Sequence, residues 1–253
     1  MSSKSARFCI LAVFLFHLCD AQAQLPAKHL TKPASRVASI PASDPCYRKL
    51  SSTGPLVAYS LMVPSHGATL VEPHHQDYLL IALKKADLTL SGPYGNTFQL
   101  HLEGGGMQVI NGGWAHRVSN LDDTGALLVE IDVAGGIKPG HAACGLAASE
   151  CADGRFGKTD EGSYSQSTLF DTPTVRLSRI SLGPGGVLEQ HRHGGDDMLV
   201  PLGPAHLDND EGGLSPSRLN LDPGEVYSLP AGTAHRIRNV ASQPVQFLEF
   251  ERK

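Results

Sequence analysis

The sequence is poor in the features that mark several common protein classes. It has no tract of clustered lysine and arginine, and its formal net charge is −4, so a nucleic-acid partner is not expected. No apolar run reaches the roughly 20 residues that a membrane-spanning helix needs. Only 6% of the residues are aromatic, whereas 27 glycines and 17 prolines indicate many turns. Gly-x-Ser-x-Gly and Cys-x-x-Cys patterns are also absent, which removes the simplest hydrolase and zinc-ribbon interpretations.

The first 23 residues have the three parts of a secretory signal peptide. Lys4 and Arg7 are followed by a 12-residue apolar run, Phe8–Cys19, which is too short to span a bilayer. Ala21-Gln22-Ala23 then offers a cleavage site of the small-x-small type. We therefore expect residues 1–23 to be removed on export, with an uncleaved anchor as the alternative. The mature protein is expected to be secreted or periplasmic and not to associate with a membrane.

Export to an oxidising compartment bears on the three remaining cysteines, Cys46, Cys144 and Cys151. Cys144 and Cys151 lie close together in a connection rich in glycine and alanine, which favours a small loop-closing disulfide. Because the count is odd, the pairing stays open.

Short apolar runs separated by turn residues dominate the chain from Leu56 onward. Residues 24–54 are polar and rich in Pro, Ser and Ala, so they predict a flexible lead-in. Beyond them, runs such as 56–63, 78–83 and 245–250 are too short for helices and are bounded by Gly, Pro and Asn or Asp. No apolar stripe with a 3.6-residue period is evident, so the fold class is predicted to be all-β.

The chain contains an internal repeat at an offset of 119 residues. This single offset aligns the two copies without a gap and matches Gly, His and Asn residues of one copy with the same residues of the other. A chance match of this kind is improbable. It predicts two copies of one domain, at residues 55–135 and 172–253, joined by a linker at 136–171. The matched segments are 72–74 with 191–193, 77–83 with 196–202, 100–105 with 219–224, 113–120 with 232–239 and 128–130 with 247–249.

The second copy carries the pattern that indicates chemistry. His191 and His193 are two residues apart on a predicted strand, so both side chains point to the same face. Pro230-Ala231-Gly232 is turn chemistry that would bring His235 in from a neighbouring strand. Imidazoles with a carboxylate suit divalent Mn, Fe, Co, Ni, Cu or Zn, and we expect one such ion per chain.

These motifs resemble those of the cupin superfamily. The first motif is Gly185-x5-His191-x-His193-x3-Asp197, and the second is Gly224-x5-Pro230-x-Gly232-x2-His235-x3-Asn239. The first departs from the family pattern by having Asp in place of Glu, and by placing the following glycine, Gly203, one residue early. The resemblance covers both copies and implies two tandem double-stranded β-helix (jelly-roll) barrels, that is, a bicupin.

The carboxylate of the metal site is ambiguous. The family spacing selects Asp197, which also shares strand parity with the two histidines, whereas the internal repeat aligns Asp196 with Asp77. We favour Asp197 as the fourth ligand beside His191, His193 and His235 or, if it does not bind the metal, as a candidate catalytic general base.

The first copy is a weaker candidate. It offers Glu72, His74, Asp77 and His116 at the matching positions, so one histidine has become a glutamate. Residues 111–113 (Asn-Gly-Gly) also replace the Pro-x-Gly turn. We favour a structural barrel without metal, with a second metal site at those four residues as the alternative.

The resemblance implies a function as well as a fold. Two-barrel cupins include dioxygenases that act on flavonols or aromatic diols and carboxylate decarboxylases. We therefore expect an exported metal-binding protein that acts on a small organic substrate as an oxidoreductase or a lyase. The alternative is a non-catalytic cupin that binds a sugar or a phenol, and a homodimer is considered in either case.

Overall fold

The computed structural model describes residues 44–137, 163–212 and 215–253, and these residues contain 18 β-strands and no helix. The predicted signal peptide and the Cys144–Cys151 disulfide lie outside the described residues. Within the described ranges, no helix is long and apolar enough to cross a membrane. The predicted all-β class is confirmed.

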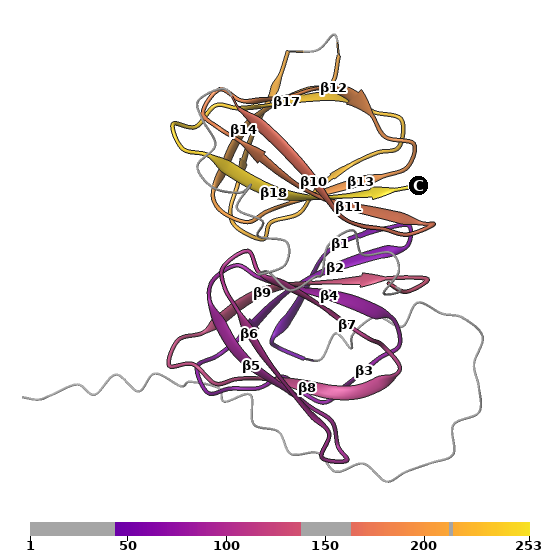
Figure 1. The fold of residues 1–253 in the computed structure, drawn as a ribbon, viewed down its shortest axis with the longest axis vertical. Coiled ribbons are helices and arrows are strands. Elements are labelled where there is room, and N and C mark those ends of the chain that lie inside the picture. The colour runs from indigo at the N-terminus through magenta and orange to yellow at the C-terminus, as the bar shows by residue number, and fades with distance from the viewer. Residues whose placement is uncertain (1–43, 138–162, 213–214) are drawn as a thin grey trace, which may run out of the picture.

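The strands form two barrels of nine strands each (Figure 1). The first barrel comprises β1 (Tyr47–Thr53), β2 (Leu56–Val63), β3 (Glu72–His74), β4 (Asp77–Ala82), β5 (Ala86–Ser91), β6 (Thr97–Leu102), β7 (Met107–Ile110), β8 (Trp114–Asn120) and β9 (Ala126–Val133). The second comprises β10 (Tyr164–Asp171), β11 (Val175–Leu182), β12 (Val187–Arg192), β13 (Asp197–Pro201), β14 (Ala205–Asp210), β15 (Ser217–Leu221), β16 (Tyr227–Leu229), β17 (Ala234–Asn239) and β18 (Val245–Arg252).

Both barrels have the same topology. In the first, a five-stranded sheet of order β1-β2-β9-β4-β7 faces a four-stranded sheet of order β3-β8-β5-β6. The second repeats this with β10-β11-β18-β13-β16 and β12-β17-β14-β15. The register also repeats, because Leu56 pairs with Val133 and Val175 pairs with Arg252, each pair shifted by the 119-residue offset. The duplication read in the sequence is therefore a duplication of structure.

Two strands lie where the sequence predicted none. β1 occupies the end of the expected lead-in and β10 the end of the expected linker. Each forms an antiparallel hairpin with the strand that follows it, β2 or β11. Because most residues of β1 and β10 are exposed or only partly buried, these segments carry no apolar run that would predict a strand.

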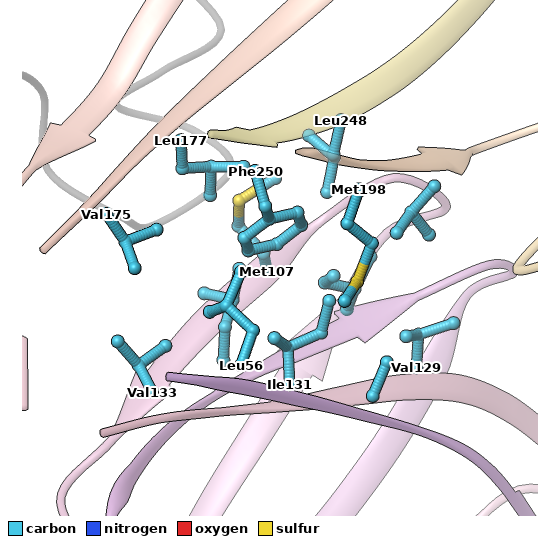
Figure 2. Packing of buried hydrophobic residues seen from close by; sticks show 14 of the residues in the cluster. Leu56, Met107, Val129, Ile131, Val133, Val175, Leu177, Met198, Leu248 and Phe250 are labelled. Atoms are coloured by element: carbon cyan, nitrogen blue, oxygen red, sulfur yellow. The ribbon is translucent and has the colours of Figure 1, made fainter. Parts of the chain in front are cut away.

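The two five-stranded sheets pack against each other (Figure 1). On β4 and β13, Leu79, Ile81, Met198 and Val200 belong to one buried apolar cluster that lies between the barrels (Figure 2). The alternate residues of the same strands face the barrel interiors instead. Both faces of these strands are therefore buried, which explains their almost continuous apolar sequences. The other members of the cluster that Figure 2 labels are Leu56, Met107, Val129, Ile131, Val133, Val175, Leu177, Leu248 and Phe250.

The interior of each barrel is apolar at one end and polar at the other. On β18, Val245 and Phe247 belong to the interior cluster of the second barrel, and Glu249 and Glu251 continue the same face of the strand. On β9, Leu128 is followed on the interior face by Glu130 and Asp132. Glu130 and Glu249 are both buried. Each barrel thus presents acidic side chains to the polar end of its interior.

Candidate metal centre

A turn held by the backbone brings the three predicted histidines of the second barrel together. Gly232 has a φ of 76°, which a residue with a Cβ adopts only with strain, and its N–H donates to the carbonyl of His193 at 3.0 Å. β17 begins immediately after this turn. His235 therefore lies directly opposite His191 in the register of β12 and β17.

The Nε2 atoms of the three imidazoles converge. His235 Nε2 lies 3.0 Å from His191 Nε2 and 3.2 Å from His193 Nε2. His193 and His235 are buried, whereas the His191 side chain is 28% exposed. The site therefore has one side that solvent reaches, and that side is at His191.

Two of the rings have an acceptor oxygen near their other nitrogen. His191 Nδ1 lies 2.8 Å from the carbonyl oxygen of Glu189, which can only accept, so Nδ1 carries the proton. His193 Nδ1 lies 3.5 Å from a carboxylate oxygen of Glu251. Such partners leave the lone pair of Nε2 facing the centre, as in protein sites where histidine binds a metal ion.

Glu249 supplies a carboxylate that the sequence did not single out. Its Oε1 lies 3.7 Å from His191 Nε2 and 3.6 Å from His193 Nε2. These three side chains and His235 each offer one ligand atom, and the four atoms lie within 4.8 Å of one another. The available signal was an acidic residue that recurs in both copies, as Glu130 and Glu249, directly after an apolar stretch of the strand.

The structure separates the two neighbouring aspartates. Asp197 is buried, and its Oδ2 lies 3.5 Å from His193 Nε2. Asp196 points away from the histidines, accepts a hydrogen bond from the Ala231 N–H and lies 3.8 Å from the Arg252 guanidinium. Strand parity is the reason, because adjacent residues of a strand face opposite sides of the sheet. Asp197 is therefore the aspartate beside the histidines, although Glu249 is the carboxylate grouped with all three.

Burial and neighbouring charges shift the pKa values of the residues of this site. Burial, and then His191 and His193, lower the pKa of His235 to about 3, so its ring is neutral. The Glu249 carboxylate raises the pKa of His191. Burial, followed by the charge of Glu249, raises the pKa of Asp197 well above its ordinary value. Within the described residues, neither oxygen of Asp197 nor Oε1 of Glu249 has a hydrogen-bond partner.

A divalent transition-metal ion fits these residues. Two ligand atoms that each lie about 2.1 Å from an ion, at a right angle, are about 3.0 Å apart. The 3.0 and 3.2 Å separations of the Nε2 atoms match this value. Three neutral imidazoles and a carboxylate are also ligands that such ions accept. The buried carboxylate oxygens that have no hydrogen-bond partner among the described residues would face the ion.

The first barrel does not bring its four predicted residues together. Asp77 lies outside the barrel interior, where its two oxygens accept hydrogen bonds from the N–H groups of Gly112 and Ile137, both at 2.8 Å. It is thus the structural counterpart of Asp196, as the repeat indicated. His116 Nε2 is 2.7 Å from the Tyr78 hydroxyl. Burial, and then the negative charge of Asp44, raise the pKa of Glu72.

Two tyrosines account for much of the difference between the barrels. Tyr78 stands at the position that Asp197 holds in the second barrel, so a phenol replaces the inward carboxylate. The Tyr47 hydroxyl donates to Glu130 Oε2 at 3.0 Å. The interior group that remains consists of His74, Glu130 and Asp132, whose ligand atoms lie within 4.8 Å of one another. Burial, and then the charge of Glu130, raise the pKa of Asp132 to about 7.

Comparison with known proteins gives the family and agrees with the fold. No family model matches the sequence. Over 85 residues, the chain is 33% identical to the β-alanine degradation protein BauB of Pseudomonas aeruginosa, and the alignment spans 33% of this chain and 86% of that protein. The chain belongs to the BauB family.

Solved structures extend the likeness to both barrels of this BauB-family chain. A cupin 2 conserved barrel domain protein from Leptotrichia buccalis superposes with a TM-score of 0.56 at 14% identity, over 87% of this chain and 92% of that one. Bacillus subtilis oxalate decarboxylase, studied for its Mn(II) centres, superposes with a TM-score of 0.53 at 13% identity, over 87% and 78%. At these identities the likeness concerns the fold alone, and the predicted pair of cupin barrels is confirmed.

Proposed function

We propose that this BauB-family bicupin is a metal-dependent enzyme that acts on a small organic substrate at its second barrel. The observation that carries the proposal is the convergence of three Nε2 atoms and the Glu249 carboxylate, with buried carboxylate oxygens that have no hydrogen-bond partner in the part of the chain that the structure describes. The proposed activity is of the dioxygenase or the decarboxylase type. The Mn(II) centres of the structurally similar oxalate decarboxylase favour Mn²⁺ as the first ion to test.

Each residue has a distinct part in the proposal. His191, His193, His235 and Glu249 would hold the ion, which supplies a Lewis acid that polarises a carboxylate or carbonyl, or a binding point for dioxygen. The exposed edge of His191 marks the side from which substrate would enter. Asp197, which lies beside His193 and has no side-chain hydrogen-bond partner among residues 44–137, 163–212 and 215–253, would accept a proton and return it. We also propose that the protein acts after export, as its N-terminal sequence predicts.

Metal analysis tests the site. The double variant His191→Ala/His193→Ala should fold and contain one metal ion per chain fewer than the unmodified protein, because two of the four ligands are gone. Elemental analysis of both purified proteins measures this difference. The control is His66→Ala/His101→Ala, which removes two exposed histidines and should leave the content unchanged. Equal metal content in the unmodified protein and the His191/His193 variant would show that the ion is not bound there.

Activity assays test the chemistry. Dioxygen uptake with phenolic substrates and carbon dioxide release from dicarboxylates should reveal turnover that is lost on chelation and in His235→Ala. A substrate that binds equally well to the chelated protein and is never converted would instead identify a non-catalytic binding protein.

A further inference from the structure

We propose that the first barrel holds a second divalent cation, at His74, Glu130 and Asp132, of which only His74 and Glu130 correspond to proposed ligands of the second barrel, His193 and Glu249. This inference goes beyond the proposed function and does not depend on it. None of its three residues corresponds to His191 or His235, and Glu130 and Asp132 both come from β9.

Strand geometry brings these side chains together. Glu130 and Asp132 are two residues apart on β9, so both project from its interior face, beyond the last apolar residue of that face, Leu128. His74, at the end of β3, points into the same space, and its Nδ1 lies 3.4 Å from Glu130 Oε1. That separation lies in the range expected for two ligands about 2.1 Å from one ion.

The two buried carboxylates of the group favour the binding of a cation. Glu130 is 0% exposed, and His74 and Asp132 are 5% and 6% exposed. Among the described residues, the ion pair of Glu130 is with His74, and neither Lys nor Arg pairs with either acid. Two carboxylates in such a space are costly without compensation, and one divalent ion would neutralise both.

Neighbouring hydroxyls leave the ligand atoms directed at one another. Tyr47 donates to Glu130 Oε2, so Oε1 is the oxygen that faces His74, and this buried Oε1 has no hydrogen-bond partner among the described residues. Tyr78 contacts Nε2 of His116, the counterpart of His235, so this nitrogen is directed at the phenol and not at the other ligand atoms. The group of ligands thereby keeps His74 of β3, does without a histidine of β8 and takes its two carboxylates from β9.

The composition and burial of the group define the kind of ion. Two carboxylates and one imidazole favour Mn²⁺ among the divalent metals that proteins bind. All three residues are buried, whereas the second barrel exposes the edge of His191. The first-barrel ion therefore stabilises the fold and takes no part in turnover.

Mn²⁺ binding to the His191→Ala/His193→Ala variant tests the proposal without interference from the second barrel. After chelation and addition of Mn²⁺ alone, this variant should bind one Mn²⁺ per chain, measured by equilibrium dialysis and by the electron paramagnetic resonance of free Mn²⁺. Adding Glu130→Gln or Asp132→Asn should weaken that binding at least about tenfold. Adding Glu72→Gln, another buried acid of the same barrel outside the group, should not.

Two results would overturn the proposal. One is a His191→Ala/His193→Ala variant that is folded but binds no Mn²⁺. The other is unchanged Mn²⁺ binding in both Glu130→Gln and Asp132→Asn. If one of these variants fails to fold, the first measurement still decides, together with the Mn²⁺-dependent rise in melting temperature of the His191/His193 variant. The second-barrel site is judged separately, by the ion lost between the unmodified protein and that variant.

Discussion

A few substitutions between equivalent positions give the two barrels different interiors. His191 corresponds to Glu72, and Asp197 corresponds to Tyr78, while His193 and His235 have histidine counterparts in His74 and His116. The phenol of Tyr78 reaches the ring of His116, whereas the shorter Asp197 leaves His235 Nε2 facing the other two imidazoles. The same backbone thus supports a three-histidine group in one copy and a mainly acidic group in the other.

Glu249 is the residue whose role rests on the structure alone, so its replacement is the most informative single change. Glu249→Gln keeps the size of the side chain but removes its negative charge and its best ligand atom. We expect Mn²⁺ affinity at the second barrel to fall by about 10-fold to 100-fold or more. Isothermal titration with the chelated protein measures this change.

The matched control is Glu189→Gln. Glu189 lies on β12 of the same barrel, and its side chain is 80% exposed and pairs with Arg236. The substitution keeps the backbone carbonyl of Glu189, which accepts from His191 Nδ1. This change should leave the affinity within error. A Glu249→Gln protein that binds Mn²⁺ as tightly as the Glu189→Gln protein would remove Glu249 from the site.

At the scale of the elements, a buried asparagine is the last residue of β8 in the first barrel and of β17 in the second. Asn239 closes β17, and its side-chain amide donates to the carbonyls of Leu182, Gly183 and Gln243 at 3.1, 3.0 and 2.9 Å. Asn120 makes the equivalent contacts in the first barrel. These bonds tie the end of the histidine-bearing strand to the loop after β11 and to the turn before β18. The asparagine that recurs in both copies of the repeat thus links neighbouring segments through hydrogen bonds of its side chain.

Asn239→Ala should destabilise the second barrel because it leaves buried carbonyl groups without a donor. The expected loss is about 1–3 kcal/mol in the free energy of unfolding. Urea denaturation followed by circular dichroism measures it. Asn220→Ala serves as the comparison, since Asn220 is an exposed residue of β15 whose side chain contacts His206. Equal stability of the two variants would contradict a stabilising role of the Asn239 hydrogen bonds.

At the scale of the whole molecule, the apolar cluster between the five-stranded sheets makes the two barrels one unit. It draws residues from β2, β4, β7 and β9 of the first barrel and from β10, β11, β13 and β18 of the second, and part of it is drawn in Figure 2. Both β9 and β18, which carry the acidic residues of the two sites, contribute side chains of their opposite face to it. Packing between the barrels therefore supports the strands that position both groups of ligands.

Met198→Ala should test this coupling. Met198 is fully buried in the cluster, and the loss of its side chain should cost about 2–5 kcal/mol. Met62→Ala is the control, because Met62 is 62% exposed and its loss should change stability by less than about 0.5 kcal/mol. Calorimetry should show one cooperative transition for both proteins, lower in temperature for Met198→Ala. Separate unfolding of two independent barrels in the unmodified protein would contradict the coupling.

The sequence by itself determined the duplication, the all-β class and the face that His191 and His193 share. It could do so because the offset repeat and the two-residue period of strands are local properties of the chain. The same period favoured Asp197 over Asp196. The described strands then follow the predicted copies closely, except that β1 and β10 begin before the predicted domain boundaries.

Only the tertiary structure decided which strands become neighbours. Glu249 and Glu130 reach their histidines from β18 and β9, far along the chain, and periodicity gives the face of a residue but not its partner across a barrel. Asp77 had the right residue type near the first-barrel motif, yet pairing of β4 turns it towards the backbone of Gly112 and Ile137. The composition of each site is therefore a consequence of closing the sheets, because closure sets distances that no short segment of the chain contains.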